Sequence, residues 1–249
     1  MMGLSIAGET SQVRYGQEVI RYTVRTNHVR SSDRVSIHVE NNGIVFVDAP
    51  SHASTQDIKK AVTKRIAWIN KHVKAAEQRL ALITPREYIS GETTYYLGRR
   101  YRLKVIKTEE EASVSIRGAY VQVKSASTSP HVVRKLLDEW YLLKARKVLS
   151  ERLANMCESL RWIKSVPPVS YRRMNVQWGS CSPNGRITLN VALIKASGQC
   201  IDYVLLHELC HLKHHNHGKG FYRLLSSHMP EWHCVKARLD GLADAILAV

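Results

Sequence analysis

The sequence predicts an α+β protein, in which hairpins and one long helix come first and a helix-rich half follows. Two patterns lead to this fold class. In several short runs apolar residues alternate with polar ones on both sides of a turn, as in half-buried strands. Over residues 54–82 and 131–160 they recur every three to four residues, as in amphipathic helices. Hairpins and helices that do not strictly alternate are typical of α+β folds.

The first hundred residues are expected to form a strand, a hairpin, a helix and a second hairpin. In the first hairpin, alternating residues 35–39 and the run 44–47 flank Asn41-Asn42-Gly43. Ser54 and Asp57 resemble a capping box at the start of a helix that runs to about Leu82. Its predicted apolar stripe is Ile58, Val62, Ile66, Ile69 and Val73. A strand pair follows around Gly98, with Tyr101, Leu103 and Val105 on one face and Arg100, Arg102 and Lys104 on the other.

Residues 108–129 are predicted to add one more hairpin, and we expect a domain boundary after it. The expected domains are therefore a basic N-terminal α+β domain, 1–129, and a C-terminal domain, 130–249. In the second, a helix is expected over 131–160, strands over 169–173 and 186–191, a helix from about 199, and a last helix from Pro230 to Leu247. The candidate core residues of the 131–160 helix are Val133, Leu136, Leu137, Trp140, Leu143 and Leu149.

Composition excludes several classes of protein. The 249 residues are 44% hydrophobic and 23% charged, which is ordinary for a globular protein and unlike a disordered chain. No apolar run is long enough for a membrane span, and the N-terminus does not resemble a signal peptide. The five cysteines are scattered, with no C-x-x-C pair, so we expect a reducing cytoplasm. The net charge of +16 indicates contact with a polyanion without naming a function.

The histidines are more informative than the charge, because seven of the twelve lie between residues 207 and 233. Among them, His207-Glu208-Leu209-Cys210-His211 has the H-E-x-x-H pattern within an apolar run. On a helix, residues four apart lie on one face, so both imidazoles can bind one ion. Glu208 lies about 100° around that helix, where it can reach a water on the ion without binding the ion.

A third ligand is predicted at His217, because Asn216 and Gly218 beside it favour a turn of the chain back toward the ion. Three imidazoles are typical of one catalytic Zn²⁺ per chain with a position open for water. We therefore predict that Glu208 acts as general base toward zinc-bound water in peptide hydrolysis. The alternative is a core or surface cluster of histidines without metal. Tyr203 and Tyr222 are candidates to assist the oxyanion.

Several segments together resemble one known family, the YgjP-like metallopeptidases. These segments are residues 177–182 (QWGSCS), 186–190 (RITLN), 201–204 (IDYV), 207–212 (HELCHL), 216–221 (NHGKGF) and 229–232 (MPEW). Trp68-Ile69 and residues 96–101 (YLGRRY) also fit the pattern. The family consists of minimal zincins similar to SprT-like proteases. The +10 spacing of the third histidine also occurs in metzincins, but His214 stands where those proteins have glycine.

The resemblance implies a zincin-like catalytic domain with an active-site helix, a small sheet and flanking helices. By position, it makes His207, His211 and His217 the metal ligands and Glu208 the catalytic residue. It also implies that Trp178, Gly179, Ser180 and Cys181 line the cleft, although packing is the better interpretation of the Cys181 and Cys210 side chains. Gln177 departs from the basic residue that we expect in relatives.

Three other functions remain open beside a peptidase acting on a protein or peptide. One is a zinc hydrolase of a non-peptide amide or ester, and another is a non-catalytic nucleic-acid module with structural zinc. The third is a nucleic-acid-associated protease, for which the SprT-like resemblance and a basic patch argue. The patch residues are Lys64, Arg65, Arg100, Arg102 and Lys104. The same charges also fit an ordinary solvated surface, and the sequence does not indicate an oligomeric state.

Overall fold

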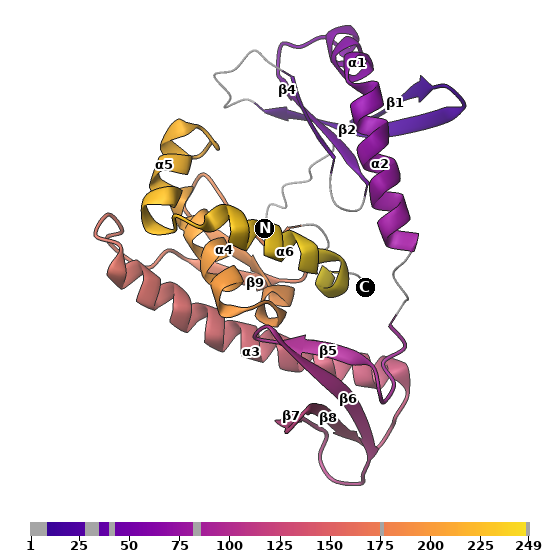
Figure 1. Cartoon of the computed structure of the whole chain (residues 1–249), viewed down its shortest axis with the longest axis vertical. Coiled ribbons are helices and arrows are strands. Elements are labelled where there is room, and N and C mark those ends of the chain that lie inside the picture. Colours follow the sequence, from indigo (N-terminus) through magenta and orange to yellow (C-terminus); the bar gives the residue numbers. More distant parts are fainter. Residues whose placement is uncertain (1–8, 28–34, 40–42, 82–85, 175–176, 248–249) are drawn as a thin grey trace, which may run out of the picture. The chain divides into compact units, whose positions relative to one another are not determined.

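Two hydrophobic cores form in this chain, one within residues 1–84 and one within residues 85–249. The computed structural model describes residues 9–27, 35–39, 43–81, 86–174 and 177–247 (Figure 1). All the elements belong to one of two compact units, Met1–Thr84 and Pro85–Val249. The α+β fold class is confirmed. The division differs from the boundary expected after residue 129, because the hairpins at 93–125 share their core with the helix that follows them.

The first unit pairs a four-stranded sheet with two helices. The strands are β1 (Glu9–Tyr15), β2 (Glu18–Asn27), β3 (Ser36–Val39) and β4 (Val45–Pro50), in the order β1-β2-β4-β3. Only β2 and β4 are parallel. The β3–β4 hairpin is confirmed, although its turn at 40–42 lies outside the described residues. The β1–β2 hairpin replaces the single strand that we expected there.

The predicted helix over 54–82 is two helices, α1 (Thr55–Lys64) and α2 (Ile66–Ala81), so the single-helix expectation was wrong. The start is as predicted, since the Ser54 hydroxyl accepts a hydrogen bond from the Asp57 N–H. The break falls at Arg65, whose backbone leaves the helical region. Two residues earlier, the Thr63 hydroxyl donates to the Lys59 carbonyl, a bond that competes with the helical ladder and bends helices.

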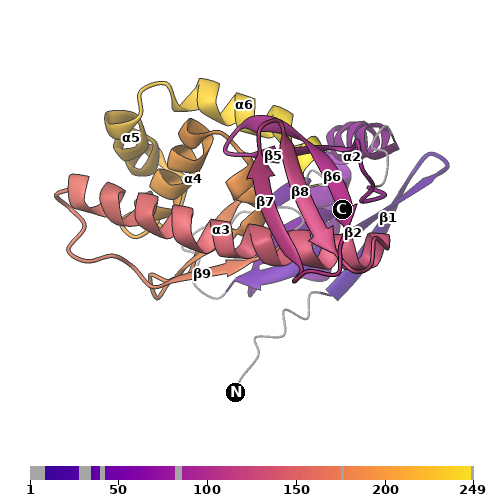
Figure 2. The same cartoon turned by 90° about the horizontal axis from the view of Figure 1, so that it is seen from below.

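In the second unit, a sheet of two hairpins packs against a long helix (Figure 2). Its strands are β5 (Thr93–Tyr96), β6 (Arg99–Lys107), β7 (Ser113–Arg117) and β8 (Tyr120–Ser125), in the order β5-β6-β8-β7. The predicted alternation in β6 is confirmed, because Leu103 is buried while Arg102 and Lys104 are exposed. The inner face, with Leu103, Val121 and Val123, therefore packs on the helix, and the outer face meets solvent.

The long helix is α3 (Pro130–Ser159), which confirms the prediction for 131–160 to within a residue. Its buried positions follow an unbroken spacing of four: Val133, Leu137, Tyr141, Ala145, Leu149, Leu153 and Cys157. Trp140 is also buried, whereas Leu143 is 65% exposed and its expected core role was wrong. Leu143 lies about 200° around the helix from Tyr141, on the side opposite this ridge.

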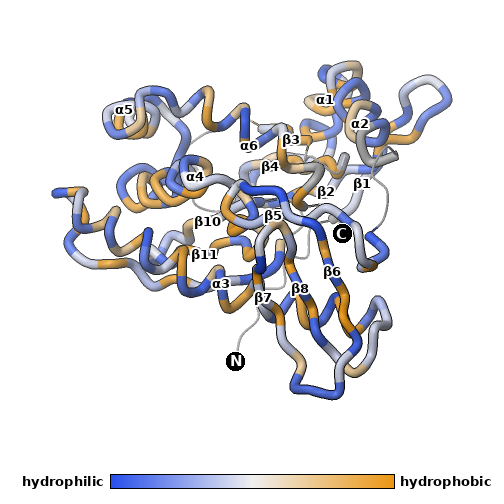
Figure 3. Tube along the Cα trace, turned by 60° about the horizontal axis from the view of Figure 1, so that its bottom comes forward, coloured by the Kyte–Doolittle hydropathy of each residue, from blue (hydrophilic) through white to orange (hydrophobic). Residues whose placement is uncertain are grey.

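The remaining elements form a small layer that carries the histidines. A three-stranded sheet has the order β10-β11-β9, with β9 (Val169–Arg172), β10 (Gly179–Cys181) and β11 (Ile187–Asn190). The 3₁₀ helix η1 (Val191–Lys195) follows, then α4 (Gly198–Cys210), α5 (Lys219–His228) and α6 (Trp232–Leu247). In Figure 3, α4 carries mostly hydrophobic colour. Of its thirteen residues, nine are buried, so α4 is the central helix of this layer.

The tip of the β5–β6 hairpin docks at the start of α4. The N–H groups of Leu97 and Gly98 donate to the carbonyls of Ile194 and Lys195, at 2.9 and 3.1 Å. Gly98 has a φ of +77°, and a β-carbon there would lie 2.8 Å from atoms of Ser197, the N-cap of α4. Position 98 therefore requires glycine, both because of its positive φ and because a side chain would clash with Ser197. Within the described ranges, no helix has the length and apolar character needed to cross a membrane.

Candidate metal and catalytic site

Three imidazoles converge beside the C-terminal end of α4. His207 lies in the last turn of α4, His211 caps that helix in a helical conformation, and His217 comes from the turn before α5. Their candidate ligand atoms all lie within 4.8 Å of one another, and the Nε2 atoms of His207 and His217 are 3.0 Å apart. The structure thus brings together the three predicted ligands, in an arrangement that one metal ion could bridge.

The protonation of two of these rings suits metal binding. The Nδ1 of His211 lies 3.1 Å from the carbonyl of His214 and can only donate to it, which leaves Nε2 with its lone pair. Burial, followed by the neighbouring His211 and His217, lowers the pKa of His207 to about 3. Burial also lowers the pKa of His211. Both rings are therefore neutral at neutral pH, the form that binds metals.

Phe221 holds all three imidazoles by packing. This fully buried ring from α5 lies 4.9, 4.7 and 4.7 Å, between centroids, from the rings of His207, His211 and His217. The contact matters most for His207, because its buried Nδ1 has no hydrogen-bond partner in the described structure. Packing against Phe221 and Tyr203, rather than a hydrogen bond, therefore orients the His207 ring.

Glu208 is buried beside the three histidines, with only 5% of its surface exposed. Its Oε2 atom has no hydrogen-bond partner among the described residues, and burial raises the pKa of its carboxyl to about 8. A carboxylate desolvated in this way binds a proton more readily than one in water. Glu208 therefore has the basicity that proton transfer near neutral pH requires.

Of the four residues predicted to line the cleft, Gly179 makes the closest approach to Glu208. A β-carbon at 179 would lie 2.8 Å from Glu208 Oε1, so only glycine lets β10 pass this carboxylate. Trp178 is half-buried and Ser180 is exposed. Cys181 is half-buried, and burial together with the nearby Glu208 raises the pKa of its thiol to about 11. The thiol therefore remains protonated, which fits packing rather than metal binding.

Asn190, for which the sequence predicted no role, forms hydrogen bonds with the backbone that leads to β10. It is fully buried, and its Nδ2 donates to the carbonyls of Met174 and Gln177 at 2.6 and 2.7 Å. Its Oδ1 accepts from the N–H of Ala192 at 3.0 Å, and its own N–H donates to the Trp178 carbonyl. A buried amide with this many partners fixes the path of the chain toward Gly179.

The two tyrosines considered for oxyanion assistance both stack on Trp232. The ring of Tyr203 stacks on Trp232 with centroids 6.4 Å apart, and that of Tyr222 with centroids 5.3 Å apart. Tyr222 is 41% exposed and its ring lies 6.2 Å from that of His217, whereas Tyr203 is buried. Tyr222 is therefore the more accessible of the two.

The predicted basic patch divides between the two units. Arg100, Arg102 and Lys104 lie on the exposed face of β6 in the second unit, whereas Lys64 ends α1 and Arg65 follows it in the first. The structure therefore describes these five residues as two separate groups, one in each unit.

Comparison with known proteins shows the family of this chain. The family described as YgjP-like, metallopeptidase domain, matches residues 33–241. A solved structure titled "Crystal structure of the metallopeptidase zymogen of Pyrococcus abyssi abylysin" is 24% identical, with a TM-score of 0.34. The match covers 37% of this chain and 91% of that one. A search of curated proteins found no match. Because the family match spans most of the sequence, the resemblance noted above is confirmed: the chain belongs to the YgjP-like metallopeptidase family.

Proposed function

We propose that this chain is a zinc peptidase, in which His207, His211 and His217 bind the ion and Glu208 is the general base. The observation that carries the proposal is the convergence of three imidazoles beside a buried carboxylate that has an unpartnered oxygen. Three imidazole nitrogen donors suit zinc, and they leave it a position for water. When bound, zinc supplies a Lewis acid at the scissile carbonyl and lowers the pKa of its water.

The chain's own residues then have distinct tasks. Glu208 accepts the proton of the attacking water at its free oxygen and passes it to the leaving amine. Gly179 and β10 restrict where that carboxylate can lie, because the strand backbone lies against it. Phe221 packs against the three imidazole rings, which keeps water away from that side of the rings and keeps the rings in place. The tyrosine best exposed to assist the oxyanion is Tyr222.

Substitution of Glu208 by Gln tests the base. We expect Glu208→Gln to retain about one zinc per chain while hydrolysis of an unfolded protein falls by about 10²- to 10⁴-fold, the usual contribution of a general base. Glu158→Gln, which removes an exposed carboxylate from α3, is the matched control and should leave both properties unchanged. Full activity of Glu208→Gln would overturn the assignment.

The ligands have their own test. His217→Ala should lower the zinc content well below one per chain, because only two imidazoles would remain. Unchanged zinc content would show that the third ligand is another residue.

A panel of ester and non-peptide amide substrates separates the peptidase from the alternative hydrolase. Five free thiols in the described part of the chain favour a reducing location such as the cytoplasm.

A second candidate function is contact with nucleic acid through the outer face of the β5–β8 sheet. Arg100, Arg102 and Lys104 are exposed there, and Lys104 Nζ lies 5.8 Å from the ring centroid of Tyr120, which is 42% exposed. Cations beside an exposed aromatic ring suit phosphates and unstacked bases. Such contact would bring the peptidase to nucleic-acid-bound proteins.

Salt-titrated binding to a single-stranded oligonucleotide tests this surface. Charge reversal of Arg100 and Arg102 should weaken binding and reduce the dependence of affinity on salt, since fewer phosphates are neutralised. Reversal of Lys147 and Arg161, which are exposed elsewhere in the same unit, changes the net charge equally and should have a smaller effect. Equal effects of the two pairs would indicate general charge attraction rather than a binding surface.

A further inference from the structure

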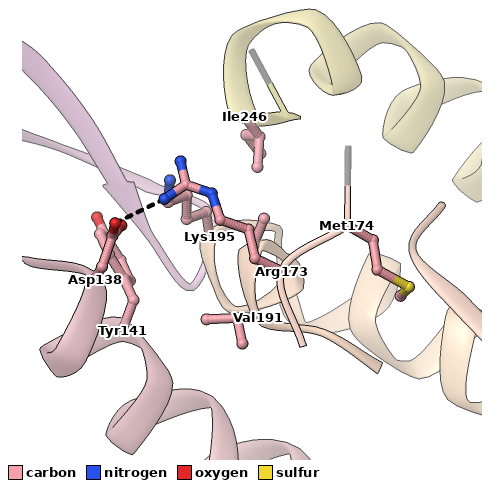
Figure 4. Close-up of a pocket in the computed structure, with 8 residues that line it drawn as sticks. Asp138, Tyr141, Arg173, Met174, Val191, Lys195 and Ile246 are labelled. Carbon is pink, nitrogen blue, oxygen red and sulfur yellow. Dashed lines mark hydrogen bonds and ion pairs between the residues drawn. The ribbon is translucent and has the colours of Figure 1, made fainter. Parts of the chain in front are cut away.

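A second polar pocket in the unit 85–249 is distinct from the histidine site. It has a volume of about 30 Å³, room for about two water-sized groups such as the two oxygens of a carboxylate. The charged lining comes from α3, from the segment after β9 and from the end of η1, as Asp138, Arg173 and Lys195 (Figure 4). None of these residues takes part in the proposed hydrolysis.

Positive charge is in excess at this pocket. Asp138 is its one lining acid, and the Oδ2 of Asp138 is already shared between Arg173 at 2.7 Å and Arg134 at 3.8 Å. Arg86 adds a further charge close enough to lower the pKa of Lys195. Two arginines thus share the one carboxylate of the lining and Lys195 adds a further positive charge, so the pocket has a net attraction for anions.

Lys195 is the cation that this arrangement leaves without a counter-ion. In the described structure Lys195 forms no ion pair. Its ammonium group lies over the ring of Tyr141, with Nζ 4.7 Å from the ring centroid. The Tyr141 hydroxyl is itself committed to the carbonyl of Tyr95 and to Thr94. Burial, Arg86 and Arg173 lower the pKa of Lys195 to about 7, while Asp138 acts in the opposite direction. A lysine in such surroundings gains most from an added anion.

The other walls of the pocket are apolar. The apolar residues that line it are Val191, Ala192, Met174 and Ile246. A multivalent phosphate would be held against aliphatic groups and beside Asp138, which is unfavourable for a doubly charged ion. A carboxylate is singly charged and planar, and it usually carries a carbon chain that such walls can cover. The lining therefore matches an organic carboxylate better than a phosphate.

We propose that this pocket binds a small organic carboxylate, whose oxygens accept hydrogen bonds from Lys195 and Arg173 while its carbon chain contacts Val191 and Ile246. Two sources present this chemistry: a free short-chain acid and the C-terminal carboxylate of a peptide. The proposal is independent of the zinc peptidase assignment, because it uses no residue of the histidine site.

Nuclear magnetic resonance of the lysine side chains tests the proposal on the full-length protein. The Lys195 signal is identified by its absence from the Lys195→Met variant. Addition of butyrate at constant ionic strength should shift that signal saturably and raise the pH at which it titrates, because the bound anion stabilises the ammonium form against the repulsion of Arg86 and Arg173. Butyramide, which has the same shape without the charge, should have no effect.

Variants and a second probe complete the experiment. Arg173→Gln should weaken butyrate binding at least tenfold, since one charge-assisted hydrogen bond is lost. Arg161→Gln removes an exposed arginine elsewhere in the unit and should not change it. An acetylated dipeptide that binds more tightly than butyrate, while its C-terminal amide does not bind, would identify peptide ends as the source. Failure of both acids to shift Lys195 saturably, or an equal shift with chloride alone, would overturn the proposal.

Discussion

Gly179 and Glu208 lie in direct contact, so that a single added carbon on the glycine would fall 2.8 Å from a carboxylate oxygen. This contact joins the edge strand β10 to the helix that carries the histidines. It also explains why a glycine stands in the Trp178–Cys181 segment, since every other side chain would push the carboxylate away from the three imidazoles.

The first prediction follows from that contact. Gly179→Ala should retain zinc but lower hydrolysis about 10²-fold, because a displacement of about 1 Å in a catalytic group is enough for such a loss. Gly241→Ala is the matched control, since a β-carbon there meets nothing within 4 Å. Steady-state kinetics and zinc content of both variants provide the measurement. Full activity of Gly179→Ala would show that Glu208 tolerates displacement.

Phe221 provides a second prediction, which concerns metal affinity. Phe221→Leu should weaken zinc binding about tenfold, since residues that orient metal ligands usually contribute 10- to 100-fold. Leu225→Val alters another fully buried residue of α5 and should reduce stability without this loss of affinity. Competition with a chelator of known affinity distinguishes the two effects. Equal zinc affinity in both variants would remove Phe221 from the site.

Asn190 provides a third prediction, which concerns stability. Asn190→Ala should lower the free energy of unfolding by about 2–4 kcal/mol, because several buried backbone groups would lose their partners. Ser159→Ala removes one exposed hydrogen bond and should change the free energy by less than about 0.5 kcal/mol. Urea denaturation measures both. A small change for Asn190→Ala would mean that water replaces the amide.

The fourth prediction concerns pH and Lys195. Because the pKa of Lys195 is near 7 in the folded chain and 10.5 in the unfolded chain, the unfolded state binds more protons between these values. The stability of the wild type relative to Lys195→Met should therefore rise from about pH 7 to pH 10.5. The groups that act on the Lys195 ammonium are Asp138 and the ring of Tyr141 from α3, Arg173 after β9, and Arg86 before β5. Denaturation at several pH values in buffers without carboxylates tests this, and a flat difference would contradict it.

The fifth prediction concerns the division of the chain. A fragment of residues 86–249 should fold cooperatively and bind zinc, because it contains a complete hydrophobic core and all three histidines. A fragment of residues 130–249 should fail, since it lacks the sheet that covers part of α3. Circular dichroism during thermal unfolding compares the two. Cooperative folding of the shorter fragment would restore the boundary after residue 129.

Sequence periodicity was sufficient for the longest helix, α3, and for the assembly of the histidines. The bounds of α3 followed from its apolar spacing, and the H-E-x-x-H pattern with His217 located three side chains that do converge. These features depend on local spacing, which a sequence displays directly.

Features that depend on contacts distant in sequence were not predicted. Helix α5 was missed because Gly218 and Gly220 weaken the helical pattern at its start, and the reason for Gly220 is tertiary: a β-carbon there would lie 2.9 Å from the His214 ring. The pocket at Lys195 likewise joins residues from four separate segments. The break at Arg65 reflects a local side-chain bond that periodicity does not detect.

The long ridge of α3 has a consequence for how this protein can evolve. One face of the helix supports both the β5–β8 sheet and the layer that carries the histidines, so these parts share a single core. Recombination within residues 86–160 would join half of that core to an unrelated surface, and the product would not fold. Exchange between the two compact units leaves both cores intact. The β5–β8 sheet is therefore tied to the layer that carries the histidines by a shared core, whereas the first unit has a core of its own.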